Sequence, residues 1–400
     1  MFCDELNKEM IDFSEPTYAL YDCSDSSTCI ETNEEIVLNY DDGTVWTEVV
    51  WDQVVVGSNL QIKNQSFLLA ENMEGNFDCY GIWGLGFPDL AQNTHPGIIA
   101  SLMKENEIDH YIFGLFLTSN ASNGSLLIIG GIDTSLMRDP DNIAYFPFIS
   151  NISYSISIGS LTLNDDFEVD LSGVIAALPD SGNSEITFPS VVIEQIADFL
   201  NNKQNMTCFF MVEEGAEDYS MLLCEVNLDS GRFPTISIGL NGTKISLEPE
   251  DYIEECVVFN NGSCICVTNL ERSNIDFEIL LGDAFLQSFY SVFDLENNTL
   301  GLARNVINNT IFIMNASDLS FQESFLETTT SITTNIEGSK EFDWKVMLVV
   351  SSLLALLPMV AFTSHFMKKK EKINESQSQT IMGIAFIGII LTINMVISMI

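Results

Sequence analysis

The chain has 400 residues, enough for two or three domains with a sizeable core. It carries 57 acidic and 15 basic residues, a formal net charge of −42 at pH 7, and this balance excludes nucleic acid as a partner, because nucleic-acid binding needs a basic surface. Such acidity can serve solubility alone, or it can mark a protein that works in acid, where protonated carboxyl groups repel one another less. The charge by itself leaves both explanations open.

The first half of the chain alternates short apolar runs with turn signals. Glu35 to Tyr40 and Thr44 to Val56 predict two strands, and Asp41-Asp42-Gly43 between them predicts the turn of a β-hairpin. Tyr80 to Phe87 (YGIWGLGF) is a further apolar run whose glycines indicate close backbone approach. His95-Pro96-Gly97 precedes an expected amphipathic helix. Other strands are expected at 67–70, 111–117 and 126–132.

The stretch 174–189, VIAALPDSGNSEITFP, holds Asp180-Ser181-Gly182 between two apolar runs. This arrangement predicts a carboxylate on a tight turn between two buried strands, although such a tripeptide is by itself most often a surface turn. A helix is expected at 191–202 with Ser190 as its N-cap. Further strand signals lie at 144–149, 154–163, 219–226, 235–240, 256–259 and 277–281. We therefore predict a mostly β protein with two lobes of similar size and one helix in each.

Cysteine, histidine and glycosylation patterns indicate the compartment. The nine cysteines and three histidines show no spacing typical of a zinc site, so we expect neither a metal nor a cofactor. Asn-x-Ser/Thr acceptors for N-glycosylation are frequent, and together with the cysteines they favour a lumenal or extracellular domain with disulfides. The acceptors begin at Asn64, Asn120, Asn123, Asn151, Asn205, Asn241, Asn261, Asn297, Asn308 and Asn315.

The last ninety or so residues predict attachment to a membrane. A Ser/Thr/Glu-rich stalk at 313–343 is followed by an apolar run at 344–366 that is long enough to span a bilayer. The basic residues of the loop 367–380, clustered at 367–372, place that loop in the cytosol and the acidic lobes outside it. The uncharged run 381–400 is expected to be a second span, and a buried or interfacial tail is the alternative.

Six segments, taken together and in order, resemble the pepsin-like aspartic peptidases of eukaryotes. The resemblance runs from about Asp22 to Arg304, and the last segment is the most specific. It implies a pepsin-like bilobal acid-protease fold, with an incomplete N-terminal lobe at 1–143 that carries the active-site flap and a C-terminal lobe at 144–312. The segments are Leu38 to Gly57, Tyr80 to Phe87, Ile128 to Leu136, Ala177 to Ser184, Phe233 to Gly242 and Ile279 to Ala303.

The resemblance implies a pair of carboxylates, one from each lobe, about 3 Å apart and sharing one proton, which places the working range in acid. Asp180 would be the carboxylate of the C-terminal lobe. Ser181, Gly182, Asn183 and Ser184 would support its turn, and Gly84 and Gly282 would carry loops beneath the two active-site turns. Tyr40 would close over substrate from the flap tip. Around it, Asp41, Asp42, Gly43 and Thr44 would face the substrate.

Three departures from the family pattern bear on activity. The first D-[ST]-G of the family is missing, and Asp4 cannot replace it because Glu5-Leu6 follows. The chain also opens without a signal peptide, so we favour a truncated reading frame over natural loss and expect the chain as printed to be inactive. Pro179 precedes Asp180 where the family has an apolar residue with a free N–H, and Asn183 stands where a hydroxyl residue is common. Asp41 and Asp42 suit a hairpin turn, and the alternative is that they repel acidic substrate residues or sharpen the acid optimum.

Cysteine pairing is only partly readable from the sequence. By resemblance, Cys224 would pair with Cys264 or Cys266, as in the C-terminal lobe of the family. Cys23 and Cys29 are expected to pair locally. Because nine is an odd number, we expect one partner in the missing N-terminal segment.

We therefore expect a membrane-anchored aspartic endopeptidase, monomeric, acting on polypeptides in an acidic compartment of the secretory or endolysosomal pathway or at the cell surface. The alternative is a non-catalytic membrane glycoprotein that keeps the peptide-binding cleft. A signal peptide and a second D-[ST]-G encoded in frame before Met1 would favour the enzyme. A stop codon there would favour the alternative.

Overall fold

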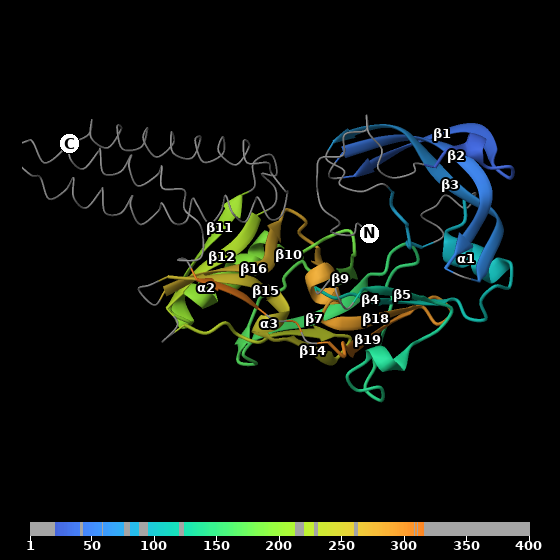
Figure 1. Cartoon of the computed structure of the whole chain (residues 1–400). Coiled ribbons are helices and arrows are strands. Elements are labelled where there is room, and N and C mark those ends of the chain that lie inside the picture. The colour runs from blue at the N-terminus through green and yellow to red at the C-terminus, as the bar shows by residue number, and fades with distance from the viewer. Residues whose placement is uncertain are drawn as a thin grey trace, which may run out of the picture. The chain divides into compact units, whose positions relative to one another are not determined.

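The computed structural model describes residues 21–40, 43–57, 59–75, 81–87, 95–119, 124–212, 220–227, 231–259, 263–307, 309 and 311–315 (Figure 1). All of these residues belong to one of the two compact units into which the chain divides. Strands dominate them, as predicted. The stalk and the candidate spans 344–366 and 381–400 lie outside the described residues, within which no helix is long and apolar enough to cross a membrane.

The predicted hairpin forms part of a three-stranded antiparallel sheet. Its strands are β1 (Ile30–Tyr40), β2 (Gly43–Val56) and β3 (Leu60–Gly75), in the order β1-β2-β3. Along β2 the side chains of Val45, Thr47 and Val49 are buried at alternate positions, as the period of two in a strand requires. Gly43 has φ of +151°, and a Cβ there would lie 2.1 Å from the carbonyl oxygen of Glu74. Only glycine fits this start of β2.

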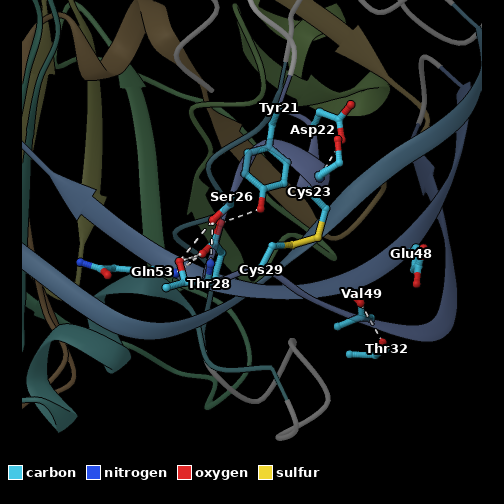
Figure 2. The surroundings of a disulfide bond; sticks show 12 residues. Tyr21, Asp22, Cys23, Ser26, Thr28, Cys29, Thr32, Glu48, Val49 and Gln53 are labelled. Carbon is cyan, nitrogen blue, oxygen red and sulfur yellow. Dashed lines mark hydrogen bonds between the residues drawn. A yellow bond between two sulfur atoms is a disulfide. The ribbon is translucent and has the colours of Figure 1, made fainter.

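A disulfide closes the short loop before β1 (Figure 2), and hydrogen bonds to Asp52 of β2 fasten this loop to the sheet. The expected pairing of Cys23 with Cys29 is confirmed. The hydroxyl of Tyr21 donates to Oδ2 of Asp52 at 2.7 Å, and the hydroxyl of Thr28 donates to Oδ1 at 2.5 Å. Asp52 is 5% exposed, and the hydrogen bonds from Thr28 and Tyr21 hold its pKa well below the usual value.

Strands from both halves of the sequence share a five-stranded sheet. Its order is β5-β4-β18-β19-β6. The strands β18 (Phe289–Asp294) and β19 (Thr299–Arg304) lie between β4 (Ile112–Phe116) and β6 (Ala144–Pro147), and β5 (Leu126–Ile129) forms one edge. Phe113 of β4 stacks on Phe293 of β18 with ring centroids 4.6 Å apart. The segment that most closely resembles the peptidase family therefore completes a sheet begun by residues far earlier in the chain.

The remaining strands form a twelve-stranded sheet within the described residues. Its main order is β11-β12-β16-β10-β17-β9-β7-β13-β14, with β15 paired to β16, β20 paired to β15 and β8 paired to β7. Their bounds are β7 (Ile156–Leu163), β8 (Phe167–Glu168), β9 (Ala176–Pro179), β10 (Ile186–Pro189), β11 (Met206–Val212), β12 (Ser220–Asn227), β13 (Ile236–Leu240), β14 (Thr243–Leu247), β15 (Ile253–Val258), β16 (Ser263–Ser273), β17 (Glu278–Leu281) and β20 (Phe312–Asn315).

Four α-helices accompany the sheets in the described part of the chain. They are α1 (Ile98–Lys104), α2 (Ser190–Lys203), α3 (Pro249–Tyr252) and α4 (Asp283–Leu286). Both predicted helices, α1 and α2, are present, but Ser190 is not an N-cap. Pro189 occupies the N-cap position of α2 without a capping side-chain hydrogen bond, and the hydroxyl of Ser190 donates to the carbonyl of Ser273 at 3.1 Å. The reason is that β10 runs parallel to β16 up to Pro189 and Ser273, which brings that carbonyl within reach.

The predicted pairing of Cys224 with Cys264 or Cys266 is wrong. Four cysteines lie side by side on the neighbouring strands β11, β12, β16 and β15. The first two form the disulfide Cys208–Cys224, and the last two form the disulfide Cys256–Cys266. Each bonded pair faces its partner directly across neighbouring strands, with Cα separations of 4.0 and 4.1 Å. Cys264 is buried and outside these disulfides, with its sulfur 3.8 Å from that of Cys266.

The prediction that the glycines of Tyr80 to Phe87 allow a close backbone approach is also wrong for the described glycines Gly81 and Gly84. A Cβ built at Gly81 or Gly84 would meet nothing within 4 Å. Residues 81–87 form no strand, and most of them are exposed or half-buried. The glycines therefore lie in open space.

The Asp52 cluster generates a stability prediction. Because the folded pKa of Asp52 is lowered, its ionised form stabilises the fold above the unfolded pKa, and this contribution is lost as the pH falls through the folded pKa. We expect Asp52→Asn to lower the thermal unfolding midpoint between about pH 5 and pH 7, with a smaller difference below about pH 3. Thermal unfolding of both proteins across this range measures it. Tyr21→Phe, which removes one donor, should give a smaller loss. An equal loss at every pH would contradict the prediction.

Candidate active site

The predicted strand–turn–strand around Asp180 is present. β9 and β10 are almost entirely buried, and Asp180 begins the turn that joins them. The N–H of Gly182 donates to Oδ1 of Asp180 at 2.8 Å, and the N–H of Asn183 donates to the carbonyl of Asp180 at 3.2 Å. The N–H of Asp180 donates to the carbonyl of Leu281 at 3.1 Å, which ties the start of the turn to β17. The half-buried carboxylate is thus held in one place while part of it remains accessible.

Gly282 packs against this turn. A Cβ on Gly282 would lie 2.1 Å from the carbonyl oxygen of Glu185 and 2.5 Å from that of Asn183, so no side chain fits. The N–H groups of Gly282, Asp283 and Ala284 donate to the carbonyls of Glu185, Asn183 and Ser184 at 3.1, 2.8 and 3.0 Å. The segment after β17 therefore binds the turn through its backbone.

The side chain of Asn183 forms hydrogen bonds with residues 185 and 187. Its Nδ2 donates to the carbonyl of Glu185 and to the hydroxyl of Thr187, both at 2.8 Å. Asn183 therefore does form hydrogen bonds at a position where the family commonly has a hydroxyl residue, and they anchor the turn to β10. Ser181 is half-buried and Ser184 is exposed. A bracing role for the Ser181 hydroxyl stays a prediction.

Sequence reasoning missed Asp283, the first residue of α4. Its Oδ1 is buried without a hydrogen-bond partner among the described residues. Burial raises the pKa of Asp283 to about 7, and the nearby Asp180 and Glu185 carboxyl groups contribute to the rise. Asp283 therefore keeps its proton in acid, next to the Asp180 turn. The only sequence signal was an acid directly after the buried strand FEILL and a glycine.

The predicted site residues fall into two groups. Asp180, Ser181, Gly182, Asn183 and Ser184 form one group together with Gly282. The other group lies at the hairpin end, where Tyr40 pairs with Gly43 and the Tyr40 side chain is 42% exposed. The hydroxyl of Thr44 donates to Oδ1 of Asn39 at 3.0 Å. Asp41 and Asp42 lie outside the described residues, and Gly84 belongs to neither group.

The glycosylation acceptors can be placed in part. Five of them are exposed: Asn64, Asn151, Asn205, Asn241 and Asn297. Asn120, Asn123, Asn261 and Asn308, and the side chain of Asn315, lie outside what the structure describes. Exposure is the condition for modification, and glycosylation itself stays a prediction.

Known proteins match this chain over most of its length. Residues 9–305 match the family model of the eukaryotic aspartyl proteases. The chain is 30% identical to gastricsin of Callithrix jacchus over 297 residues, which covers 72% of this chain and 71% of gastricsin. It is 28% identical to pepsin A of Sus scrofa over 285 residues, which covers 70% of this chain and 69% of pepsin A.

The close packing of Gly282 yields a paired prediction. Gly282→Ala forces a methyl group against two backbone oxygens, and we expect it to destabilise the fold by roughly 3 kcal/mol, the upper end for overpacking. Gly84→Ala is the matched control, since its methyl group would meet nothing within 4 Å. Denaturant unfolding of both variants measures the difference. Equal stability of the two variants would show that the turn does not need this contact.

Asp283 yields a pH-dependent prediction. Its folded pKa of about 7 lies above the usual 3.8, so the folded state holds a proton that the unfolded state has released. Stability therefore falls as the pH rises from about 4 to about 7. Asp283→Asn cannot ionise, so we expect its stability to fall less over this range, whereas Asp198→Asn, at an exposed position of α2, should follow the parent. Denaturant unfolding at several pH values measures both slopes. Parallel curves for Asp283→Asn and the parent would refute the prediction.

Proposed function

The chain belongs to the family of eukaryotic aspartyl proteases and is an aspartic endopeptidase of the pepsin type, and on this premise we propose that Asp180 is one of its two catalytic carboxylates. One observation carries the assignment. The Asp180 carboxylate is held by the Gly182 N–H on a turn between two buried strands, and part of it remains accessible. A reacting group needs such a fixed and accessible position.

The proposed reaction is hydrolysis of a peptide bond by water. One carboxylate of the pair takes a proton from water as the water attacks the peptide carbonyl, and the other, protonated, donates a hydrogen bond to the carbonyl oxygen. The two carboxyl groups share one proton because like charges this close cannot both ionise, so the activity has an acidic optimum. Asp180 supplies one of them.

We place the second carboxylate before the Cys23–Cys29 loop. The first D-[ST]-G of the family is absent from the printed sequence, which favours an aspartate encoded upstream of Met1. Because the family match starts at residue 9, Asp12 also lies in the matched region and is the competing candidate. If neither aspartate serves, the alternative is a non-catalytic glycoprotein that keeps a peptide-binding cleft, and the lack of a D-[ST]-G before the hairpin in the printed sequence favours it.

We further propose that the hairpin end acts as the flap. Tyr40 is exposed at the end of β1, where a hairpin can fold over a bound peptide and exclude water. The lobes at 1–143 and 144–312 are proposed as the two halves that bind a polypeptide between them. Membrane anchoring by 344–366, with 381–400 as a second span and 367–372 in the cytosol, is proposed from the apolar and basic runs of the sequence. The peptidase part would then face a lumen or the cell exterior.

Proteolysis assays test the assignment of Asp180. We expect cleavage of a denatured protein between about pH 3 and pH 7, with an acidic maximum, by the chain extended with its upstream coding sequence. Asp180→Asn should lower kcat at least about 100-fold, the scale of general acid–base catalysis, and Asp198→Asn should leave kcat unchanged. Activity that survives Asp180→Asn would remove Asp180 from the reaction, and a neutral optimum would refute the acidic setting.

The printed chain, assayed in parallel with and without Asp12→Asn, locates the second carboxylate. An inactive printed chain beside an active extended chain supports an upstream aspartate. Activity of the printed chain that is lost on Asp12→Asn would assign Asp12 instead. If both chains are inactive, the non-catalytic alternative stands.

A further inference from the structure

A chain of part-buried hydrogen bonds runs from the Asp180 turn to a carboxyl group on another strand. Nδ2 of Asn183 donates to Oγ1 of Thr187 at 2.8 Å, and Oγ1 of Thr187 donates to Oε2 of Glu271 at 2.8 Å. Thr187 is 1% exposed. Its strand, β10, runs parallel to β16, and Thr187 and Glu271 are direct partners in that pairing. The register of the two strands thus brings Glu271 to Thr187.

The chemistry of the three groups sets the direction of each hydrogen bond. A hydroxyl has one hydrogen to donate, and the Thr187 hydroxyl donates it to Oε2 of Glu271. The hydroxyl hydrogen of Thr187 therefore points to Glu271, and the Thr187 oxygen must accept its second hydrogen bond from an N–H. Only the NH₂ of the Asn183 amide can supply that hydrogen, and the second hydrogen of the amide goes to the carbonyl of Glu185. The acceptor oxygen of Glu271 thereby determines which way the Asn183 amide faces.

The backbone of Asn183 connects these side-chain hydrogen bonds to the Asp180 turn. Its N–H donates to the carbonyl of Asp180 at 3.2 Å, and its carbonyl accepts from the N–H of Asp283 at 2.8 Å. The side chain is thus fixed to the sheet while the main chain holds the turn. If the Thr187 hydroxyl were lost, a part-buried N–H of Asn183 would lack its acceptor, which favours another side-chain position.

We propose that Thr187 and Glu271 are positioning residues for Asp180, acting through Asn183. The inference rests on the proposed catalytic role of Asp180. Neither residue touches the reacting atoms. They keep the Asp180 carboxylate in the orientation that the reaction needs, so their loss lowers kcat and leaves KM nearly unchanged.

The test compares substitutions that keep the series of hydrogen bonds with substitutions that break it. The variants are made in the full-length protein that shows activity. Thr187→Val and Glu271→Met each remove one member, and we expect each to lower kcat about tenfold with KM within about twofold. Thr187→Ser keeps the hydroxyl and Glu271→Gln keeps an acceptor oxygen, and both should stay within about threefold of the parent kcat. Equal losses from the conserving and the breaking substitutions would overturn the proposal.

The double variant Thr187→Val/Glu271→Met separates a shared role from two independent ones. Residues that act through one chain show non-additive effects, so the double variant should lose about as much kcat as either single variant. A loss near 100-fold, the product of the two single losses, would show that the residues act separately and would overturn the proposal.

Hydrogen exchange gives a readout that does not depend on activity. We expect the backbone amides of residues 182 and 183 to exchange faster in Thr187→Val and Glu271→Met than in the parent, with parent-like exchange in Thr187→Ser. If the parent itself has no peptidase activity, the proposed function fails while this measurement still decides whether the two residues hold the turn. Unchanged exchange in the breaking variants would overturn the inference.

Discussion

The Asp180 turn depends on a contact that tolerates no side chain, the packing of Gly282 against the carbonyl oxygens of Asn183 and Glu185. β9 and β10 both pair with β17, so the segment that leaves β17 must pass directly against the segment that joins β9 to β10. Backbone hydrogen bonds from Gly282 and the two residues after it then fasten the turn. Position at the candidate site is therefore supplied mainly by backbone, which moves less than exposed side chains do.

Opposite environments shift the pKa values of two carboxyl groups in opposite directions. Asp52 accepts hydrogen bonds from Thr28 and Tyr21, which favour its ionised form, so these bonds persist as the pH falls. Oδ1 of Asp283 is buried without a hydrogen-bond partner among the described residues, and this burial favours the protonated form. In acid, Asp52 therefore keeps its hydrogen-bonded charge, and Asp283 stays protonated and avoids a buried charge. Both shifts suit the acidic setting proposed for this protein, where much of the net charge of −42 is also neutralised.

Local patterns predicted the local structure well. The hairpin of β1 and β2, the strand–turn–strand around Asp180 and the helices α1 and α2 all follow from alternation, turn residues and helical periodicity. The errors concern contacts between distant segments. Ser190 donates a hydrogen bond to Ser273 because β10 and β16 are parallel neighbours. Cys224 forms a disulfide with Cys208 because the two residues face each other across β11 and β12. Neither neighbour could be identified from spacing along the chain.

The sequence by itself determined the family, the mostly β fold and Asp180 as the candidate catalytic carboxylate, because ordered motifs and apolar periodicity are properties of neighbouring residues. Only the tertiary structure decided which groups surround that carboxylate. Gly282, Asp283, Thr187 and Glu271 reach the turn through the pairing of β9 with β17 and of β10 with both β17 and β16. Strand order depends on how the whole core packs, and a residue about ninety positions away in the chain becomes a direct neighbour only when that packing is complete.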